Sequence, residues 1–130
     1  MTKVRGLFSI LLCFCLANCA PIAFLAGAAA GVSGYKYYKG SLTVIYQAQY
    51  MKTWDASIKA MEEMGFNIED KKQELSTGKI EARLADNKPV TVSVKYKSSQ
   101  ETEVTIRVGL FGDENASNVI KDKIGSVLFK

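Results

Sequence analysis

Apolar and polar residues alternate along five short runs in the C-terminal two thirds of the chain, and short polar turns separate most of these runs. Alternation with a period of two places every second side chain on the same side of a strand. A strand of this kind buries one face and exposes the other. We therefore expect five antiparallel strands that share one covered face. The runs are 42–48, 66–72, 80–84, 90–96 and 104–110, of which the second begins with Phe66 and Ile68 and turns polar through residues 69–72.

Two other segments follow the helical repeat. Trp54 and Met61 belong to an apolar stripe with helical spacing over residues 51–64. Gly65 follows as a helix stop, because glycine readily adopts the left-handed conformation that ends many helices. Asp113 is placed to cap a second helix at its N-terminus. The expected buried stripe of this second helix is Ala116, Val119, Ile120, Ile124, Val127 and Leu128.

The predicted order is β-α-β-β-β-β-α, an α+β domain over residues 41–130 with both helices on one face of a five-stranded antiparallel sheet. The first helix carries the chain back, so the first and second strands point the same way and the fifth can pair with the first. The expected sheet order is 1-5-4-3-2. The uncovered face is interpreted as solvated, with a docking surface as the alternative. Its expected residues are Thr43, Gln47, Lys79, Glu81, Arg83, Thr91, Ser93, Lys95, Thr105 and Arg107.

The N-terminal 18 residues have the pattern of an export signal. Lys3 and Arg5 make a short basic start, and residues 7–17 are an apolar run of 11 residues. A run of that length suits the apolar region of a signal peptide and is too short by itself to span a bilayer. Residues 1–18 are therefore expected to be a signal peptide, and the segment that ends at Cys19 indicates the signal peptide of a lipoprotein.

The segment Leu16-Ala17-Asn18-Cys19 resembles the lipobox of bacterial lipoproteins. The resemblance implies cleavage before Cys19 and attachment of diacylglycerol, with further acylation such as palmitate, at that residue. Asn18 departs from the Gly, Ala or Ser that is usual in its place. Ala20 stands where an Asp commonly retains lipoproteins at the inner membrane, which implies the outer membrane, facing the periplasm. Two or three acyl chains anchor a protein firmly.

The alternative role of the three cysteines is metal or redox chemistry. Cys13, Cys15 and Cys19 lie within seven residues of one another, and the rest of the chain has none. Their apolar neighbours keep thiols protonated and inert, and no second cluster completes a set of four ligands. The chain also contains no histidine, the commonest metal ligand and general base. We expect no metal, no cofactor and no enzymatic activity.

Residues 19–40 are expected to be the lipidated N-terminus and a Gly/Ala-rich tether. The stretch 21–34 is uncharged, and Tyr35-Lys36-Tyr37-Tyr38-Lys39 follows with the composition of a membrane–water interface. Three interpretations remain: a linker packed on its own domain, a segment lying in the membrane surface, and an uncleaved transmembrane anchor over residues 7–34. The net charge of +4 is too small to indicate nucleic-acid binding.

The stretch Ile106-Arg107-Val108-Gly109-Leu110-Phe111-Gly112-Asp113-Glu114, "IRVGLFGDE", resembles a family of small bacterial lipoproteins classed only as a domain of unknown function. The resemblance implies an envelope lipoprotein with an α+β domain and no known catalytic residues. Read physically, the two glycines let the chain turn sharply from a strand into a helix. An anion site at this helix start is the alternative, which the two acidic residues oppose.

The sequence therefore favours a membrane-anchored, non-enzymatic envelope lipoprotein that binds a protein partner or helps to organise the envelope. Docking of an envelope partner, of anionic lipid or of glycan on the uncovered sheet face is the alternative to a solvated face. The alternative is a module for a small ligand or a lipid, with a cleft between the helices and the sheet lined by Trp54 and Phe66.

Overall fold

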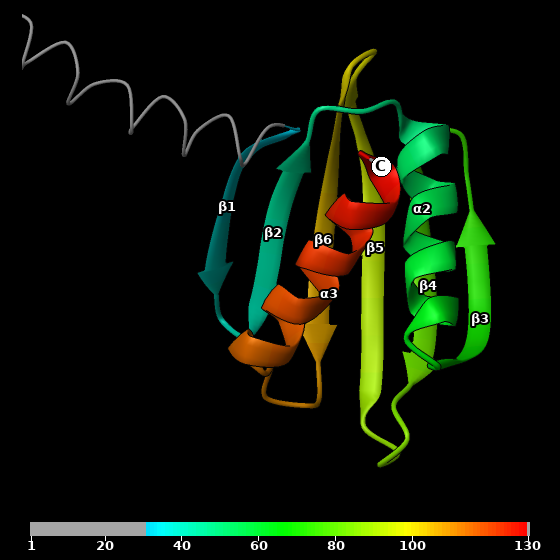
Figure 1. The fold of residues 1–130 in the computed structure, drawn as a ribbon, viewed down its shortest axis with the longest axis vertical. Coiled ribbons are helices and arrows are strands. Elements are labelled where there is room, and N and C mark those ends of the chain that lie inside the picture. Colours follow the sequence, from blue (N-terminus) through cyan, green and yellow to red (C-terminus); the bar gives the residue numbers. More distant parts are fainter. Residues whose placement is uncertain (1–30, 130) are drawn as a thin grey trace, which may run out of the picture. The chain divides into compact units, whose positions relative to one another are not determined.

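The computed structural model describes residues 31–129, which form one compact unit of their own. Six strands and two helices follow one another in this part of the chain (Figure 1). Their bounds are β1 (Val32–Tyr38), β2 (Ser41–Tyr46), α2 (Tyr50–Glu63), β3 (Asn67–Gln73), β4 (Thr77–Arg83), β5 (Pro89–Ser98), β6 (Glu101–Val108) and α3 (Glu114–Leu128). The signal peptide, the lipobox, Cys19 and the tether up to residue 30 lie outside the described residues.

The strands form a single antiparallel sheet in the order β1-β2-β6-β5-β4-β3. From β2 onward this is the order expected from the sequence, because α2 reverses the chain and β6 then pairs with β2. The expected number of five strands is wrong, since β1 adds a sixth at the edge. The additional strand lies within residues 19–40, where a tether was expected.

Strand β1 forms because a tight turn folds it back onto β2. Lys39 and Gly40 have φ values of 51° and 83°, the pair of positive angles that a two-residue hairpin turn requires. Tyr37 faces Leu42 across the hairpin and packs against the core. The ammonium group of Lys121 lies 3.7 Å from the ring centre of Tyr35, a cation–π contact that ties β1 to α3. Tyr35–Tyr38 therefore belong to the sheet.

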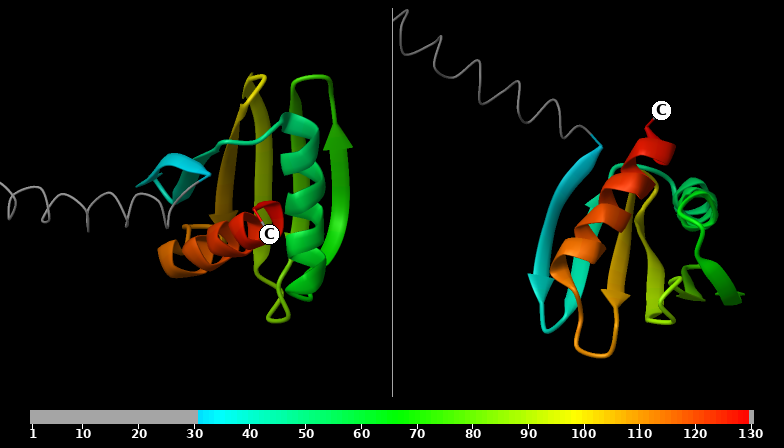
Figure 2. Two further views of the ribbon diagram at one scale, coloured as in Figure 1. Left: turned by 45° about the horizontal axis from the view of Figure 1, so that its top comes forward. Right: turned by 60° about the horizontal axis from the view of Figure 1, so that its bottom comes forward.

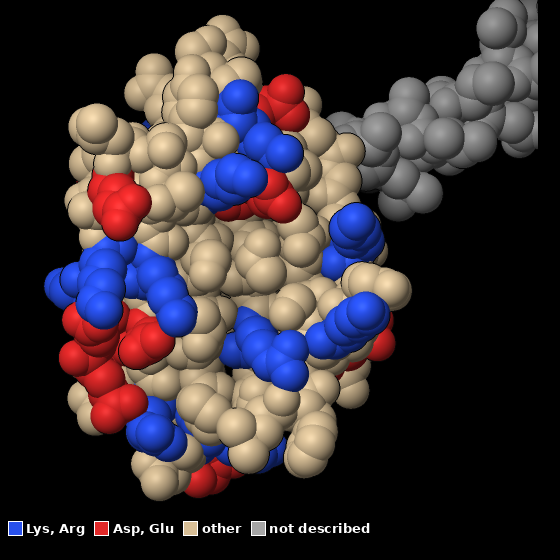
Figure 3. Space-filling view, turned by 180° about the vertical axis from the view of Figure 1, so that it is seen from behind, with Lys and Arg blue, Asp and Glu red and all other residues tan. Residues whose placement is uncertain are grey.

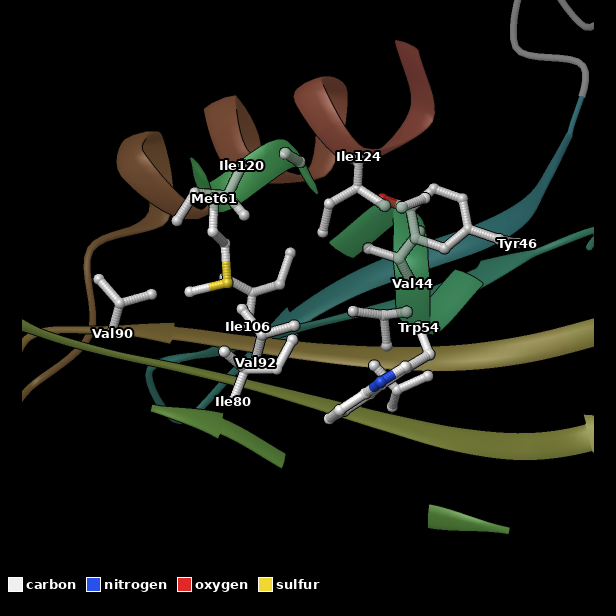
Figure 4. Close-up of a cluster of buried hydrophobic side chains, with 14 of the residues drawn as sticks. Val44, Tyr46, Trp54, Met61, Ile80, Val90, Val92, Ile106, Ile120 and Ile124 are labelled. Carbon is white, nitrogen blue, oxygen red and sulfur yellow. The ribbon is translucent and has the colours of Figure 1, made fainter. Parts of the chain in front are cut away.

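Both helices lie on one face of the sheet (Figure 2), as the sequence predicts. Apolar side chains from both layers interlock between them (Figure 4), and the largest fully buried ones include Tyr46, Leu42 and Met61. One position of the predicted α3 stripe is wrong, because Val119 is 56% exposed. Ser117 is buried instead, since a small residue allows the helix to pack closely against its neighbours.

The strands and helices all run between two ends of the domain (Figure 1). We call the end that holds Gly31 and the loops 47–49, 74–76 and 99–100 the near end, because the described chain begins there. The amide of Gln47 donates to the carbonyl of Gly31 at 2.6 Å. The far end holds the turn 39–40 and the loops 64–66, 84–88 and 109–113.

Candidate functional site

Nothing in the described part of the chain resembles a catalytic or metal centre. Among residues 31–129, no group of three or more His, Cys, Asp or Glu side chains is placed to hold a metal ion. The hydroxyl of Ser117 is buried without a hydrogen-bond partner in that same range, and no histidine exists to activate it. Within these residues no helix is both long and apolar enough to cross a membrane.

The structure places Trp54 and Phe66 apart. Trp54 is 5% exposed and its ring lies against β4, where a Cβ on Gly78 would come within 2.4 Å of the indole. Phe66 follows the other end of α2 and lines a shallow cavity of about 380 Å³ with Met64 and Leu84. The glycine at position 78 is thus explained by packing of the indole, and Trp54 is not among the residues that line the cavity beside Phe66.

The open face of the sheet is an ordered array of hydroxyl and basic side chains. Strand register places one residue from each strand in a row that crosses the whole sheet. The hydroxyls in the middle of this row have no hydrogen-bond partner among the described residues. Figure 3 shows lysine and arginine side chains around an uncharged centre of this face. In sheet order the row is Lys36, Thr43, Thr105, Ser93, Lys79 and Lys72.

A shallow groove of about 420 Å³ lies on this face over β4 and β5. The ion pairs along it are partly exposed, as in Lys79–Glu81 at 3.0 Å and Lys97–Glu103 at 3.3 Å, so water screens them and each contributes little to stability. Lys95, which lines the groove, has no acidic partner within the described residues. The face can therefore take up anionic or hydroxyl-rich groups, although it is equally suited to water.

A different feature stands out at the far end, in the loop between β6 and α3. Leu110 is 75% exposed and Phe111 is 92% exposed. The expected run 104–110 had placed Leu110 in a strand, which is wrong, because β6 ends at Val108 and Gly109 turns the chain away with a φ of 76°. We call Leu110 and Phe111 the far-end tip. The sequence signal for it is two large apolar residues between two turn-forming glycines.

The backbone under the far-end tip is held from several sides. A Cβ on Gly112 would lie 2.3 Å from the Cα of Gly40, so the loop packs directly on the β1–β2 turn. The guanidinium of Arg107 donates to the carbonyl of Lys39 at 3.1 Å and also to the carbonyl of Leu110. Arg107, expected simply on the open face, therefore joins two turns of the far end.

The start of α3 completes this support. The Asp113 carboxylate accepts a hydrogen bond from the amide of Ala116 at 3.0 Å and so caps the helix. This confirms the predicted cap, and it fills the position that an anion would need. The amide of Gly109 donates to the carbonyl of Pro89 at 2.7 Å. A cavity of about 630 Å³ lies beside the far-end tip, between loop 84–88 and the start of α3.

Comparison with known proteins gives the family and no activity. A search of curated proteins finds no match to the chain. A family model described as "Protein of unknown function (DUF3568)" matches residues 3–126. This match covers nearly the whole chain, including the described domain and the "IRVGLFGDE" stretch. The chain therefore belongs to this family of proteins of unknown function, DUF3568.

Proposed function

We propose that this protein is a lipid-anchored, non-enzymatic component of the bacterial cell envelope that docks a protein partner through the far-end tip. The anchor is Cys19, and the proposed location is the outer membrane, facing the periplasm. The observation that carries the docking role is the pair of exposed apolar side chains, Leu110 and Phe111, on a fixed loop.

The proposal for the anchor rests on the sequence around Cys19. A basic start, an 11-residue apolar run and the segment Leu16-Ala17-Asn18-Cys19 together have the order that lipoprotein export requires. A thioether-linked diacylglycerol on Cys19 would bury enough methylene groups for stable attachment, since each contributes about 0.8 kcal/mol. Ala20 supports the outer membrane.

The proposal for docking rests on exposure and on support. Water-exposed Phe and Leu side chains that adjoin one another mark interaction sites more often than isolated ones do. The loop that carries them is fixed by the Gly112–Gly40 contact and by the two hydrogen bonds of Arg107. A loop whose backbone is already held in one conformation loses less conformational entropy when a partner covers it. The far-end tip thus presents two exposed apolar side chains on a loop whose backbone is already ordered for binding.

The open face supplies a second, polar part of the same docking surface. Arg107 lies on it and reaches the loop of the far-end tip through its guanidinium. Tyr38, which is 65% exposed, stands in the same cross-strand row as Arg107 through Ser41. A partner seated on the far-end tip would meet these side chains at its rim, where polar contacts set orientation.

Site-specific photo-cross-linking in cells tests the docking role. A photoreactive phenylalanine analogue replaces Phe111 in the full chain, and a matched variant carries it at Val119, which is 56% exposed on α3. We expect one protein adduct of defined mass from position 111, lost when Leu110→Ser is added, and no such adduct from position 119. The same weak, heterogeneous adducts from both positions would contradict the proposal.

A further inference from the structure

The near end of the domain also exposes large apolar side chains, and they gather around one turn. Leu75, at the tip of the β3–β4 turn, is 100% exposed, while Met51 and Tyr96 are 54% and 46% exposed. We call these three residues the near-end patch. Nothing in the core requires Leu75 at this position, because its side chain is fully in water.

Hydrogen bonds hold the three parts of the near-end patch together. The Tyr50 hydroxyl, next to Met51 in α2, donates to the carbonyl of Glu74 at 3.2 Å. The amide of Tyr96 donates to the carbonyl of Ser76 at 2.8 Å. The turn that carries Leu75 is therefore fixed between the first turn of α2 and the end of β5, with all three apolar side chains at one end of the domain.

The position of the near-end patch relative to the chain entry indicates what covers it. Residues 20–30 are 11 residues between Cys19 and Gly31, and they can reach at most roughly 40 Å when fully extended. The domain begins with Gly31 at the near end, and β5, with its 10 residues, spans roughly 33 Å toward the far end. The near end can therefore lie at a membrane that holds Cys19 with the tether at any length, whereas the far end can do so only when residues 20–30 are extended over most of this reach.

We infer that the near-end patch lies on the lipid bilayer, with Leu75 inserted among the acyl chains and Tyr96 at the headgroups. This inference rests on the proposed lipid anchor at Cys19, which keeps the domain close to the surface. The anchor makes a weak contact persist, because it keeps the domain at a high local concentration beside the bilayer.

The chemistry around the near-end patch fits the interface of a bilayer. Tyrosine is enriched at that depth because its ring is apolar and its hydroxyl stays hydrated. Lys52 follows Met51 and Lys95 precedes Tyr96, and neither has an acidic partner among residues 31–129. Long lysine side chains can reach headgroup phosphates while their methylene groups cover apolar surface. A bilayer, which has no fixed shape to match, therefore suits these three apolar side chains and their neighbouring lysines better than a protein groove does.

Fluorescence quenching by brominated lipids tests this inference with the native lipidated chain. Leu75→Trp and, as a matched control, Phe111→Trp are reconstituted into vesicles of phosphatidylethanolamine and phosphatidylglycerol, with and without bromine on the acyl chains. The native Trp54 is 5% exposed, and the wild-type chain gives its background. We expect the added indole at position 75 to be quenched at least about twofold more than that at position 111.

Each other outcome overturns the inference. Equal quenching at the two positions would mean that the domain has no preferred end on the lipid, and stronger quenching at position 111 would mean that the far end lies there. The acyl mass on Cys19, measured by mass spectrometry in the same sample, separates the two proposals. A chain without acyl mass counts against the anchor, whereas an unquenched indole at position 75 on an acylated chain counts against the contact.

Discussion

The near and far ends of the domain both expose large apolar side chains, but they hold them in different ways. At the far end, the loop backbone is held directly. Gly112 packs on Gly40, and the Arg107 guanidinium donates hydrogen bonds to two loop carbonyls. At the near end, the Tyr50 hydroxyl donates to the carbonyl of Glu74 at 3.2 Å, and the amide of Tyr96 donates to the carbonyl of Ser76 at 2.8 Å. The stability of the far end should therefore fall when a side chain is added at its glycines. The stability of the near end should fall when a tyrosine hydroxyl can no longer donate its hydrogen bond.

The difference matches the two contacts that we propose. A protein partner requires apolar side chains in fixed positions, because its own surface is fixed. A bilayer is fluid and adapts to side chains that are spread along one end of a domain. The two ends therefore suit a domain that contacts the membrane through the near-end patch and binds a protein partner through the far-end tip.

The largest predicted effect comes from filling the contact between the two far-end turns. In Gly112→Ala, the new Cβ would overlap the backbone of Gly40, and alanine is strained at the φ of 86° found there. We expect a loss of about 3 kcal/mol in the free energy of unfolding. Urea denaturation of the detergent-solubilised full chain measures it.

Gly109→Ala is the matched control for this substitution. Its φ of 76° imposes the same backbone strain, but nothing lies within 4 Å of the added Cβ. The loss should therefore be only about 1 kcal/mol, from strain alone. Equal losses for the two variants would show that the contact with Gly40 does not matter.

Removing the Tyr46 hydroxyl tests the bond between the end of β2 and α3. Tyr46→Phe deletes the bond to the Lys121 carbonyl in a buried site and should reduce the free energy of unfolding by about 1.5 kcal/mol at neutral pH. Thermal or urea unfolding measures this loss. A variant as stable as the wild type would show that packing alone holds α3 on β2.

The same hydroxyl predicts a pH dependence. Burial, with the nearby charge of Asp122, raises the pKa of Tyr46 above the ordinary tyrosine value of 10.0. The unfolded chain then loses this proton at a lower pH than the folded one. The stabilisation of the folded state by the Tyr46 hydroxyl is complete below about pH 10 and is lost as the pH rises from there through the folded-state pKa. Stability measured stepwise above that pH should fall less steeply in Tyr46→Phe than in the wild type, and parallel profiles would contradict this.

A smaller effect is expected from Arg107→Lys. A lysine bonds the carbonyls of Lys39 and Leu110 less well, because one ammonium nitrogen replaces the two guanidinium nitrogens that donate to them separately. The bonds are exposed, so the free energy of unfolding should fall by only about 1 kcal/mol. The yield of the cross-linked adduct from position 111 should fall clearly although the domain stays folded, since the loop of the far-end tip loses its support. An unchanged adduct would show that Arg107 does not position the loop.

The smallest effect on stability is expected at the near-end patch. Leu75→Ser removes a fully exposed side chain, so the free energy of unfolding should change by less than about 0.5 kcal/mol. The variant should nevertheless leave the bilayer more readily, which hydrogen exchange of the β3–β4 turn in vesicles would report as faster exchange than in the wild type. Equal exchange would contradict a lipid contact at Leu75.

Most of the sheet could be predicted because alternation and chain direction leave few choices. Leu42, Val44 and Tyr46 alternate cleanly, and the reversal by α2 allows β6 to pair antiparallel with β2, as it does. Strand β1 was missed because Tyr35-Lys36-Tyr37-Tyr38 has the composition of a membrane interface as well as that of a strand. The turn-forming pair Lys39-Gly40 was the signal that would have identified the hairpin.

The candidate sites were harder to predict because exposure depends on where a strand stops. Leu110 continues the alternation of β6 in the sequence, but the positive φ of Gly109 ends the strand before it. Val119 follows Ala116 by three residues, yet it lies about 200° around the helix axis from the buried Ser117 and so points to solvent. The cap at Asp113 was predicted correctly because it depends only on residues next to it in the chain.

The most direct test of the account is the intact mass of the membrane-extracted protein, with radiolabelled palmitate incorporation, beside a Cys19→Ser variant. The account predicts that the wild-type chain starts at Cys19 and carries acyl mass, and that the variant incorporates no label. A full-length chain without label would contradict the lipid anchor and would return residues 7–34 to the interpretation of a transmembrane segment.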